Sequence, residues 1–326
     1  MPAKPVVPET MTAAVMPRPN QIVVQTVPVP KLAPQDVLIK VHACGICGTD
    51  LHIFHGDSRG ATYPIIAGHE IAGEIAAVGP EATDVPIGAR VVTEGRAGTG
   101  FSRDGGYAEY VSVPKEMLHF LPAHVDMIEA ALIDPLACAV NAVNRAHLSP
   151  TDKVAVIGQG SSGLCMTQAA RALVGCEVAG VDHHDENLAL SRKFGASLTV
   201  NPKATDAEAA LREWSGGKGP DRILEATGRE SAVDLALRAI RREGRIVIYG
   251  VFGHPISVTM DTIMGKQIEL AGAVGSLNCY PTAVQLLSEG KVDLRSIVGR
   301  IMSLRELPEA LRLLEERKVY KVVIVP

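Results

Sequence analysis

The glycine-rich segment Gly158-Gln-Gly-Ser-Ser-Gly163 constrains the fold of this chain more than any other feature of its sequence. An apolar run at residues 154–157 precedes it, and a helical pattern from Leu164 to Leu173 follows it. Glycines at this spacing between a strand and a helix permit a tight turn and the close approach of a pyrophosphate to the positive helix end. We therefore expect the phosphates of a dinucleotide to contact Gly158, Gly160, Ser161, Ser162 and Gly163.

The region around this segment alternates between predicted strands and helices. The expected strands are 154–157, 177–181, 198–200, 222–225, 245–249 and 267–272. Strands that alternate with helices are typical of a parallel sheet, and six of them satisfy a doubly wound α/β fold. We therefore assign residues 136–276 to a Rossmann dinucleotide-binding domain.

Asp182 ends the second expected strand, about 20 residues beyond the glycine-rich segment. A carboxylate at this place accepts hydrogen bonds from the adenosine ribose hydroxyls and repels a 2′-phosphate. His183 and His184 follow it, and the next arginine is Arg192. The pattern favours NAD over NADP. The alternative is that Asp182 merely ends a strand.

The first part of the chain has a different pattern. Short β-type runs broken by proline and glycine fill residues 11–122, which predicts an antiparallel, partly barrel-like β domain. Two helical segments and a closing strand near the end of the chain are expected to pack back on this domain. We thus expect a β-rich domain of residues 1–135 and 277–326, and a chain of the α/β class.

Composition narrows the class of partner. Charged residues make up 21% of the 326-residue chain and the net charge is −4, which offers no basic surface to nucleic acid or to an anionic membrane. The N-terminus has no apolar signal core, and no apolar run approaches the ~18 residues of a membrane helix. Six scattered cysteines indicate free thiols or metal ligands rather than a disulfide framework. We expect a cytoplasmic protein that acts on small molecules.

A second motif, Cys44-Gly-Ile-Cys47-Gly-Thr-Asp-Leu-His52, precedes Gly68-His69-Glu70. Thiolate, imidazole and carboxylate groups bind zinc, and a catalytic zinc has three protein ligands and one open position. The sequence near the two cysteines lacks the second ligand pair of a zinc knuckle and the strand–helix context of a redox dithiol. Such a pair in a β-rich domain is most often one ligand and one core residue. Together with the dinucleotide segment, this motif indicates metal-assisted hydride transfer.

The order and spacing of these motifs resemble those of the zinc-dependent medium-chain dehydrogenases, in the branch of sorbitol and threonine dehydrogenases. The resemblance is carried by the segments around Cys47 and His69, by Gly105-Gly-Tyr-Ala-Glu-Tyr110, by the Gly158 segment and by Lys321-Val-Val-Ile. It implies a GroES-like catalytic domain in which Cys47 and His69 hold zinc and Cys44 serves packing. Asp134 is the expected third ligand, with Glu70 as the alternative.

The resemblance assigns further roles. Thr49 and His52 are expected to pass a proton from the substrate to solvent, and Asp50 is expected to hold the second ring nitrogen of His69. The remaining expected cofactor contacts are Thr227, Gly250, Val251, Ala273, Val274 and, at the pyrophosphate, Lys321. Many relatives bind a structural zinc through four cysteines of a lobe that corresponds to residues 93–104. This segment contains no cysteine here, so we expect one zinc per chain.

The expected reaction is hydride transfer between NAD and a secondary alcohol or ketone, with a polyol or sugar alcohol as the first choice of substrate. L-Threonine or a diol is the alternative substrate, and the resemblance implies a homo-oligomer, either a dimer or a tetramer. Candidate contacts to a polar substrate, which are otherwise solvated loop residues, are His55, Arg59, Phe101 and Arg103. Two rival functions are a zinc-free enone or quinone reductase that uses NADPH and a non-catalytic nucleotide-binding descendant. Neither has a physical need for the whole set of ligands and proton-relay residues.

Overall fold

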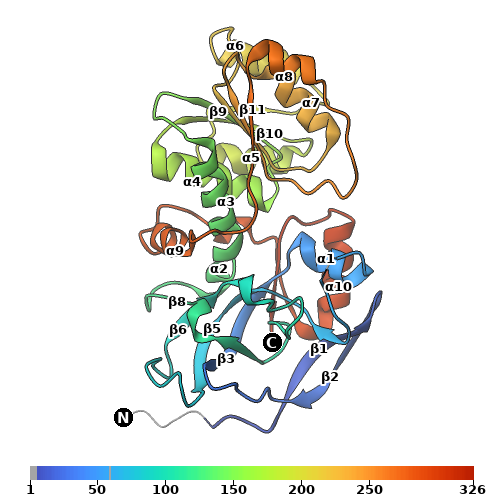
Figure 1. Cartoon of the computed structure of the whole chain (residues 1–326), viewed down its shortest axis with the longest axis vertical. Helices are drawn as coiled ribbons and strands as arrows, with labels where there is room; N and C mark the ends of the chain where they lie inside the picture. Colours follow the sequence, from blue (N-terminus) through green and yellow to red (C-terminus); the bar gives the residue numbers. More distant parts are fainter. Residues whose placement is uncertain (1–5, 59) are drawn as a thin grey trace. The chain divides into compact units, whose positions relative to one another are not determined.

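The computed structural model describes residues 6–58 and 60–326 and divides the chain into two compact units (Figure 1). The first unit is Met1–Asp134 with Leu294–Pro326, and the second is Pro135–Asp293. The return to the first unit therefore lies after residue 293, and the expected boundary at residue 277 is wrong. Helix α9 (Tyr280–Ser288) belongs to the second unit, where the Gln168 side chain bonds both the N–H and the C=O of Asp293 at 2.6 and 3.2 Å.

Two sheets, mainly antiparallel, form the first unit, in agreement with the β-rich domain expected from the sequence. The larger sheet follows the order β15 (Arg300–Ser303), β16 (Val322–Val325), β3 (Asp36–Gly45), β5 (Glu70–Val78), β6 (Arg90–Thr93) and β8 (Leu118–Phe120), and β7 (Tyr110–Pro114) also pairs with β3. The smaller sheet has the order β2 (Gln21–Pro28), β1 (Thr10–Arg18) and β4 (Ile65–Ile66). Only β15 and β16 are parallel among these strands.

The register of strand β3 determines which residues meet at one end of the larger sheet. Strand β3 is buried along most of its length because it pairs with β5, β7 and β16. Gly45 at its end lies opposite both Glu70, the first residue of β5, and Val323 near the start of β16. The segments around Cys47, His69 and Lys321 therefore come together although they are far apart in the sequence.

The second unit contains the six-stranded parallel sheet that the sequence predicts. Its order is β11 (Leu198–Val200), β10 (Glu177–Val181), β9 (Lys153–Ile157), β12 (Arg222–Glu225), β13 (Arg245–Ile248) and β14 (Glu269–Gly272). This order is that of a doubly wound dinucleotide fold, with the reversal of direction between β9 and β12. The connecting helices of this unit are α3 (Ile133–Ala146), which begins two residues before it, α4 (Ser161–Val174), α5 (Asp185–Lys193), α6 (Ala207–Trp214), α7 (Glu230–Ala239) and α8 (Met260–Lys266).

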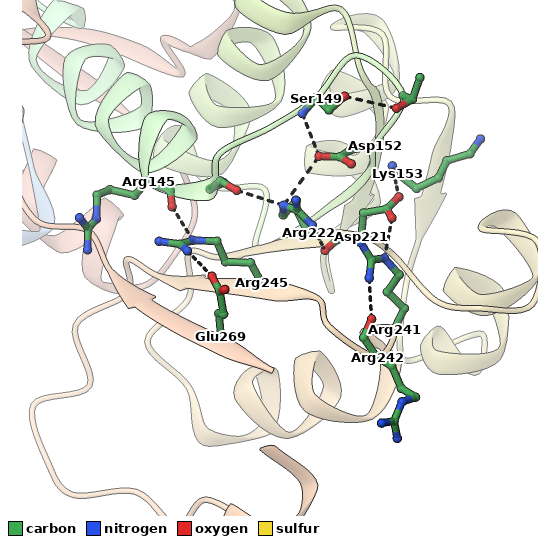
Figure 2. A network of polar contacts seen from close by, with 12 residues as sticks. Arg145, Ser149, Asp152, Lys153, Asp221, Arg222, Arg241, Arg242, Arg245 and Glu269 are labelled. Carbon is green, nitrogen blue, oxygen red and sulfur yellow. Dashed lines mark hydrogen bonds and ion pairs between the residues drawn. The ribbon is translucent and has the colours of Figure 1, made fainter. Parts of the chain in front are cut away.

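Arginines close the amino edge of this sheet, as Figure 2 shows. The Arg222 guanidinium donates to the Ala146 carbonyl at 3.1 Å, and the Arg245 guanidinium donates to the Arg145 carbonyl at 2.8 Å and also pairs with Glu269. These carbonyls belong to the last turn of α3, where backbone acceptors have no partner within the helix. The amino edge thus serves stability, and the carboxyl edge is left for a ligand.

No helix in the described part of the chain is long and apolar enough to cross a membrane.

Candidate metal and nucleotide sites

A positive φ angle at Gly68 directs the two residues that follow it. Gly68 has φ +91°, and a Cβ atom there would lie 2.8 Å from both the Cys44 sulfur and the Tyr107 ring. Only glycine fits such a turn without strain. Cys44 is fully buried at this place and burial raises the pKa of its thiol, which agrees with a packing role and disfavours a metal-binding thiolate.

Three potential ligands converge beyond this turn. Cys47, which precedes helix α1 (Gly48–His55), joins His69 and Glu70 in a group whose sulfur, ring nitrogen and carboxylate oxygen all lie within 4.8 Å of one another. His69 is 6% exposed and Glu70 is 1% exposed. A sulfur, a nitrogen and an oxygen donor in one group, of which the nitrogen and oxygen donors are buried, fit a zinc ion in its catalytic form. The structure therefore brings together three of the four predicted ligands.

Asp50 connects this group to the surrounding backbone. Its buried carboxylate accepts hydrogen bonds from the Cys47 N–H at 2.8 Å, the Gly68 N–H at 3.3 Å and the Tyr107 hydroxyl at 2.9 Å. Its Oδ1 also lies 3.6 Å from His69 Nδ1. Burial opposes ionisation of Asp50, but the charge of His69 and these hydrogen bonds lower its pKa below the usual value. Asp50 is therefore next to His69, as the sequence predicts, but the two side chains are separated by the distance of an ion pair and not of a hydrogen bond.

Lys321 contacts a candidate zinc ligand, a contact that the sequence interpretation did not include. Its ammonium group is 2% exposed and donates to Glu70 Oε1 at 2.6 Å and to the Ile46 carbonyl at 2.9 Å. Burial lowers the pKa of this lysine, but the Glu70 carboxylate outweighs that effect and raises the pKa above its usual value. In this structure Lys321 thus neutralises a candidate ligand, and its expected contact with the pyrophosphate stays a prediction.

Asp134 lies outside the group of three but acts on it. Burial raises the pKa of Glu70, the charge of Lys321 lowers it, and the charge of Asp134 raises it, with a net increase. Two carboxylates therefore compete near one lysine. Glu70, and not Asp134, is among the three groups whose donor atoms lie within 4.8 Å of one another, so Glu70 becomes our first candidate for the third ligand and Asp134 the alternative, in the reverse of the order drawn from the sequence.

The two residues of the expected proton route lie on one helix. The Cys47 thiol donates to Thr49 Oγ1 at 3.6 Å, so the Thr49 hydroxyl borders the metal group. His52 lies one turn further along α1, where its side chain is 54% exposed and its Nδ1 is 3.0 Å from Asp57. Positions three apart on a helix share a face.

The candidate substrate contacts do not all lie near the metal group. His55 bonds Asn20 at 2.9 Å and Glu315 at 2.9 Å, and Arg103 bonds Asp36 at 2.6 Å, so both side chains are engaged by residues outside the metal group. Arg59 lies outside the described residues. Phe101 contacts the site directly, because its ring centroid lies 5.0 Å from that of His69. Our sequence interpretation did not anticipate this contact with a metal ligand.

The carboxyl edge of the parallel sheet collects the predicted cofactor residues. A Cβ atom on Gly158 would lie 2.6 Å from Thr227 Cγ2, and one on Gly163 would lie 1.8 Å from the Gly158 carbonyl oxygen. Gly160 faces open space, and α4 begins immediately after it without a side-chain cap. The first N–H groups of α4, including those of Ser161 and Ser162, are thus the kind of donors that bind a phosphate.

Asp182 lies beside this glycine-rich turn. One of its carboxylate oxygens accepts the Gln159 N–H at 2.7 Å, and the other accepts the His184 N–H at 2.9 Å. These two bonds hold the carboxylate at the end of β10, next to the end of β9. The place matches that of a ribose-binding acid.

The remaining expected contacts follow the ends of the next three strands. Thr227 comes after β12, Gly250 and Val251 after β13, and Ala273 and Val274 after β14; Val251 is 79% exposed and Val274 is 80% exposed. Sequence reasoning missed Glu225, which is fully buried and whose Oε1 accepts the N–H groups of Thr227 at 2.7 Å and Gly228 at 3.0 Å. Its position at a strand end, before Ala-Thr-Gly, was the available signal.

Comparison with known proteins agrees with this arrangement. Residues 33–123 match the alcohol dehydrogenase GroES-like domain, and residues 163–289 match the zinc-binding dehydrogenase domain. An erythritol/L-threitol dehydrogenase of Mycolicibacterium smegmatis is 32% identical over 98% of this chain and 99% of its own length. Each of the two domain matches lies within one of the two units of the structure.

Solved structures show the same architecture. A putative zinc-binding dehydrogenase of Sinorhizobium meliloti, bound to NADP, has a TM-score of 0.91 and 29% identity, and covers 97% of this chain and 99% of its own. An alcohol dehydrogenase of Escherichia coli CFT073, in complex with NADH, has a TM-score of 0.90 and 26% identity, and covers 98% of this chain and all of its own. With its GroES-like unit, its Rossmann unit and a Cys–His–Glu group at the predicted place, the chain belongs to the zinc-binding, medium-chain alcohol dehydrogenase family.

Proposed function

We propose that this protein is an NAD-dependent polyol dehydrogenase that uses a single zinc ion, held by Cys47, His69 and a carboxylate, to transfer hydride between NAD and a secondary alcohol. The observation that carries the proposal is the group of the half-buried Cys47 and the buried His69 and Glu70, whose donor atoms lie within 4.8 Å of one another. It belongs to a chain whose second unit has the strand order and glycine-rich turn of a dinucleotide-binding fold.

A bound zinc would supply a Lewis acid that lowers the pKa of an alcohol hydroxyl. The chain's own residues orient the ligands and move the proton. Asp50 holds the Cys47 backbone and faces His69, as a carboxylate behind a metal-bound imidazole does. Thr49, next to Cys47, receives the hydroxyl proton, and His52, whose side chain is exposed, releases it to solvent.

Glu70 is the third ligand in this proposal, and Asp134 is its competitor. Glu70 is within reach of the other two donors but is bonded to Lys321. Asp134 is close enough for its charge to raise the pKa of Glu70. A Glu70→Gln variant that keeps its zinc while Asp134→Asn loses it would assign the ligand role to Asp134 instead.

Cofactor choice rests on Asp182, because the two similar structures hold different cofactors, NADH and NADP. The Asp182 carboxylate directly follows β10, and the next arginine in the sequence, as a candidate to bind a 2′-phosphate, is Arg192. We expect Asp182→Gly combined with His183→Arg to shift the ratio of kcat/KM values from NAD toward NADP by at least about tenfold, or ~1.4 kcal/mol. Unchanged selectivity would mean that the ribose binds elsewhere.

A polyol or sugar alcohol is the proposed substrate class, with L-threonine or a simple diol as the alternative. Support comes from the 32% identical erythritol/L-threitol dehydrogenase, which spans nearly the whole chain. The assay that separates these classes is NADH formation across a panel of polyols, diols and hydroxy amino acids. A kcat/KM for threonine above that of every polyol would favour the alternative.

We also propose a homo-oligomer, a dimer or a tetramer, in the cytoplasm. Strand β14 is an end strand of its sheet, and exposed apolar side chains lie on it and near it in the chain: Met260, Met264, Leu270 and Val274. A free apolar strand edge is a surface that a second copy covers. No cysteine in the described part of the chain forms a disulfide, as is usual in proteins of a reducing compartment. Light scattering of the purified protein tests the oligomer, and a monomer at micromolar concentration would contradict it.

The proposed function is tested by elemental analysis of the purified protein together with NAD reduction before and after chelation. We expect about one zinc per chain and loss of NADH formation when the zinc is removed. Two zinc ions per chain would contradict the single site. Nucleotide binding without zinc and without polyol turnover would favour the zinc-free reductase if NADPH reduces an enone or quinone, and the non-catalytic descendant if it does not.

A further inference from the structure

We propose that the short loop, residues 94–105, forms a wall around the imidazole of His69, with Phe101 as a positioning residue for that ligand. This inference rests on the proposed function, because it concerns the metal site named there. The short loop occupies the stretch in which the sequence lacks the cysteines of a structural zinc lobe. The stretch that replaces a structural zinc lobe thus has a role at the catalytic metal site.

The first observation is the ring contact. The centroids of the Phe101 and His69 rings are 5.0 Å apart and the ring planes are inclined by 35°. The two rings are thus in contact in a tilted arrangement. His69 Nδ1 is buried and makes no hydrogen bond to any described residue, and its distance of 3.6 Å to Asp50 exceeds that of a hydrogen bond. Packing against Phe101 therefore acts together with the charge of Asp50 to limit rotation of the imidazole.

Two glycines of the short loop also lie close to the Gly68–His69 segment. A Cβ atom on Gly95 would lie 3.4 Å from the Cβ of His69, which is tighter than an ordinary contact. A Cβ atom on Gly100, where φ is +79°, would lie 2.8 Å from the carbonyl carbon of Gly68. The loop thus approaches Gly68 and His69 at three points, and at two of them the contact depends on the absence of a side chain.

Bonds outside the metal group hold the loop in this place. The Ile66 N–H donates to Asp104 Oδ1 at 2.9 Å, and the Gly105 N–H donates to the Ile66 carbonyl at 2.6 Å. The Thr62 N–H donates to the Phe101 carbonyl at 3.2 Å. These bonds fix the backbone at Phe101 and on its carboxyl-terminal side, so the position of the ring does not depend on a metal ion. A preformed support of this kind reduces the freedom that a ligand loses when it binds metal.

The consequence concerns retention of the ion. An imidazole that rotates freely releases a metal ion more readily than one held in the binding orientation, and loss of a group that orients a ligand costs roughly 10–100-fold in metal affinity. Phe101 also covers the imidazole face from water. We therefore expect removal of the ring to accelerate zinc loss and to alter the ligand field, with nucleotide binding in the second unit unaffected.

The experiment compares Phe101→Ala and Phe101→Leu with Phe120→Ala. Phe120 is a matched control, because it is a phenylalanine of the same unit with 52% of its surface exposed. Zinc transfer to a colorimetric chelator gives the release rate, and the visible spectrum of the cobalt-substituted protein reports the ligand geometry. We expect Phe101→Ala to release zinc at least about tenfold faster, with a changed cobalt spectrum. Phe101→Leu should be intermediate and Phe120→Ala should equal the unmodified protein.

The outcomes separate this inference from the function on which it rests. A Phe101→Ala protein that releases zinc at the unmodified rate, with an unchanged cobalt spectrum, overturns the role of Phe101 and leaves the zinc enzyme intact. Absence of zinc from the unmodified protein overturns both. If Phe101→Ala does not fold, as its metal-free thermal midpoint shows, Phe101→Leu decides, and a release rate equal to that of the unmodified protein overturns the proposal.

Discussion

The metal group of the first unit depends on buried charges, whereas the carboxyl edge of the second unit depends on the shape of the backbone. Asp50 and Glu70 are buried and bonded to partners far away in the chain, Tyr107 and Lys321. At the nucleotide edge, the required feature is the absence of side chains at Gly158 and Gly163. A site of the first kind fails when a partner is removed, and one of the second kind fails when an atom is added.

The largest effect expected from this contrast is that of Asp50→Ala. The change removes the acceptor for two N–H groups and the Tyr107 hydroxyl and leaves His69 without its counter-charge. Removal of one member of a buried charge pair costs ~3–5 kcal/mol. Urea denaturation of the metal-free protein measures the loss. Asp57→Ala, at an exposed position beyond the end of α1, is the control and should change stability little. A small loss for Asp50→Ala would show that the group is not organised by charge.

A smaller effect is expected when a methyl group is added at the nucleotide edge. Gly163→Ala places a Cβ atom 1.8 Å from the Gly158 carbonyl oxygen, so α4 must move, at a cost of ~1–3 kcal/mol in stability. Gly160→Ala meets no atom within 4 Å and should leave the free protein unchanged. It should weaken NADH binding because the methyl group enters the space left for the ligand. Thermal midpoints and fluorescence titration with NADH measure both effects, and equal destabilisation by the two variants would contradict the comparison.

The smallest effect concerns acid stability in the first unit. Burial would raise the pKa of Glu94, but its bonds to Arg96 and His119 lower the pKa below its usual value. A carboxylate with a lowered folded-state pKa stabilises the fold above its unfolded-state pKa, and this contribution is lost as the pH falls through the folded-state value. Glu94→Gln should therefore reduce stability at pH 7 by about 1 kcal/mol and by less near pH 3. Denaturation at both pH values tests this, with the exposed Glu186→Gln as the control. An equal reduction at both values would exclude the charge effect.

Local sequence patterns were sufficient to predict these strands and the glycine-rich turn of the second unit. The strands at 177–181, 198–200 and 222–225 have the predicted bounds because an apolar run, a turn and a helix follow one another within a few residues. The glycine spacing and Asp182 are also local features, and their strand-end placement follows from the parallel topology.

The first unit was harder to predict because its contacts span the whole chain. The segments of Cys47 and His69 were found by their residue types, but the partner of Glu70 is 251 positions away. No periodicity reports such a pairing. The contact of Phe101 with His69 depends on the path of a loop, and the boundary at residue 293 depends on side-chain bonds from Gln168. These features follow from tertiary packing that local patterns do not encode.

The bond between Lys321 and Glu70 has a consequence for the order in which the protein can be made. Every candidate zinc ligand and both sheets of the first unit, apart from β15 and β16, are synthesised before residue 294. A nascent chain that has emerged only to residue 320 therefore has the ligands but still lacks the ammonium group that neutralises Glu70. Burial of the Glu70 carboxylate then has no lysine to offset its cost, which disfavours the burial of this end of β5. Burial of Glu70 is thus coupled to the pairing of the last strand, β16, with β3.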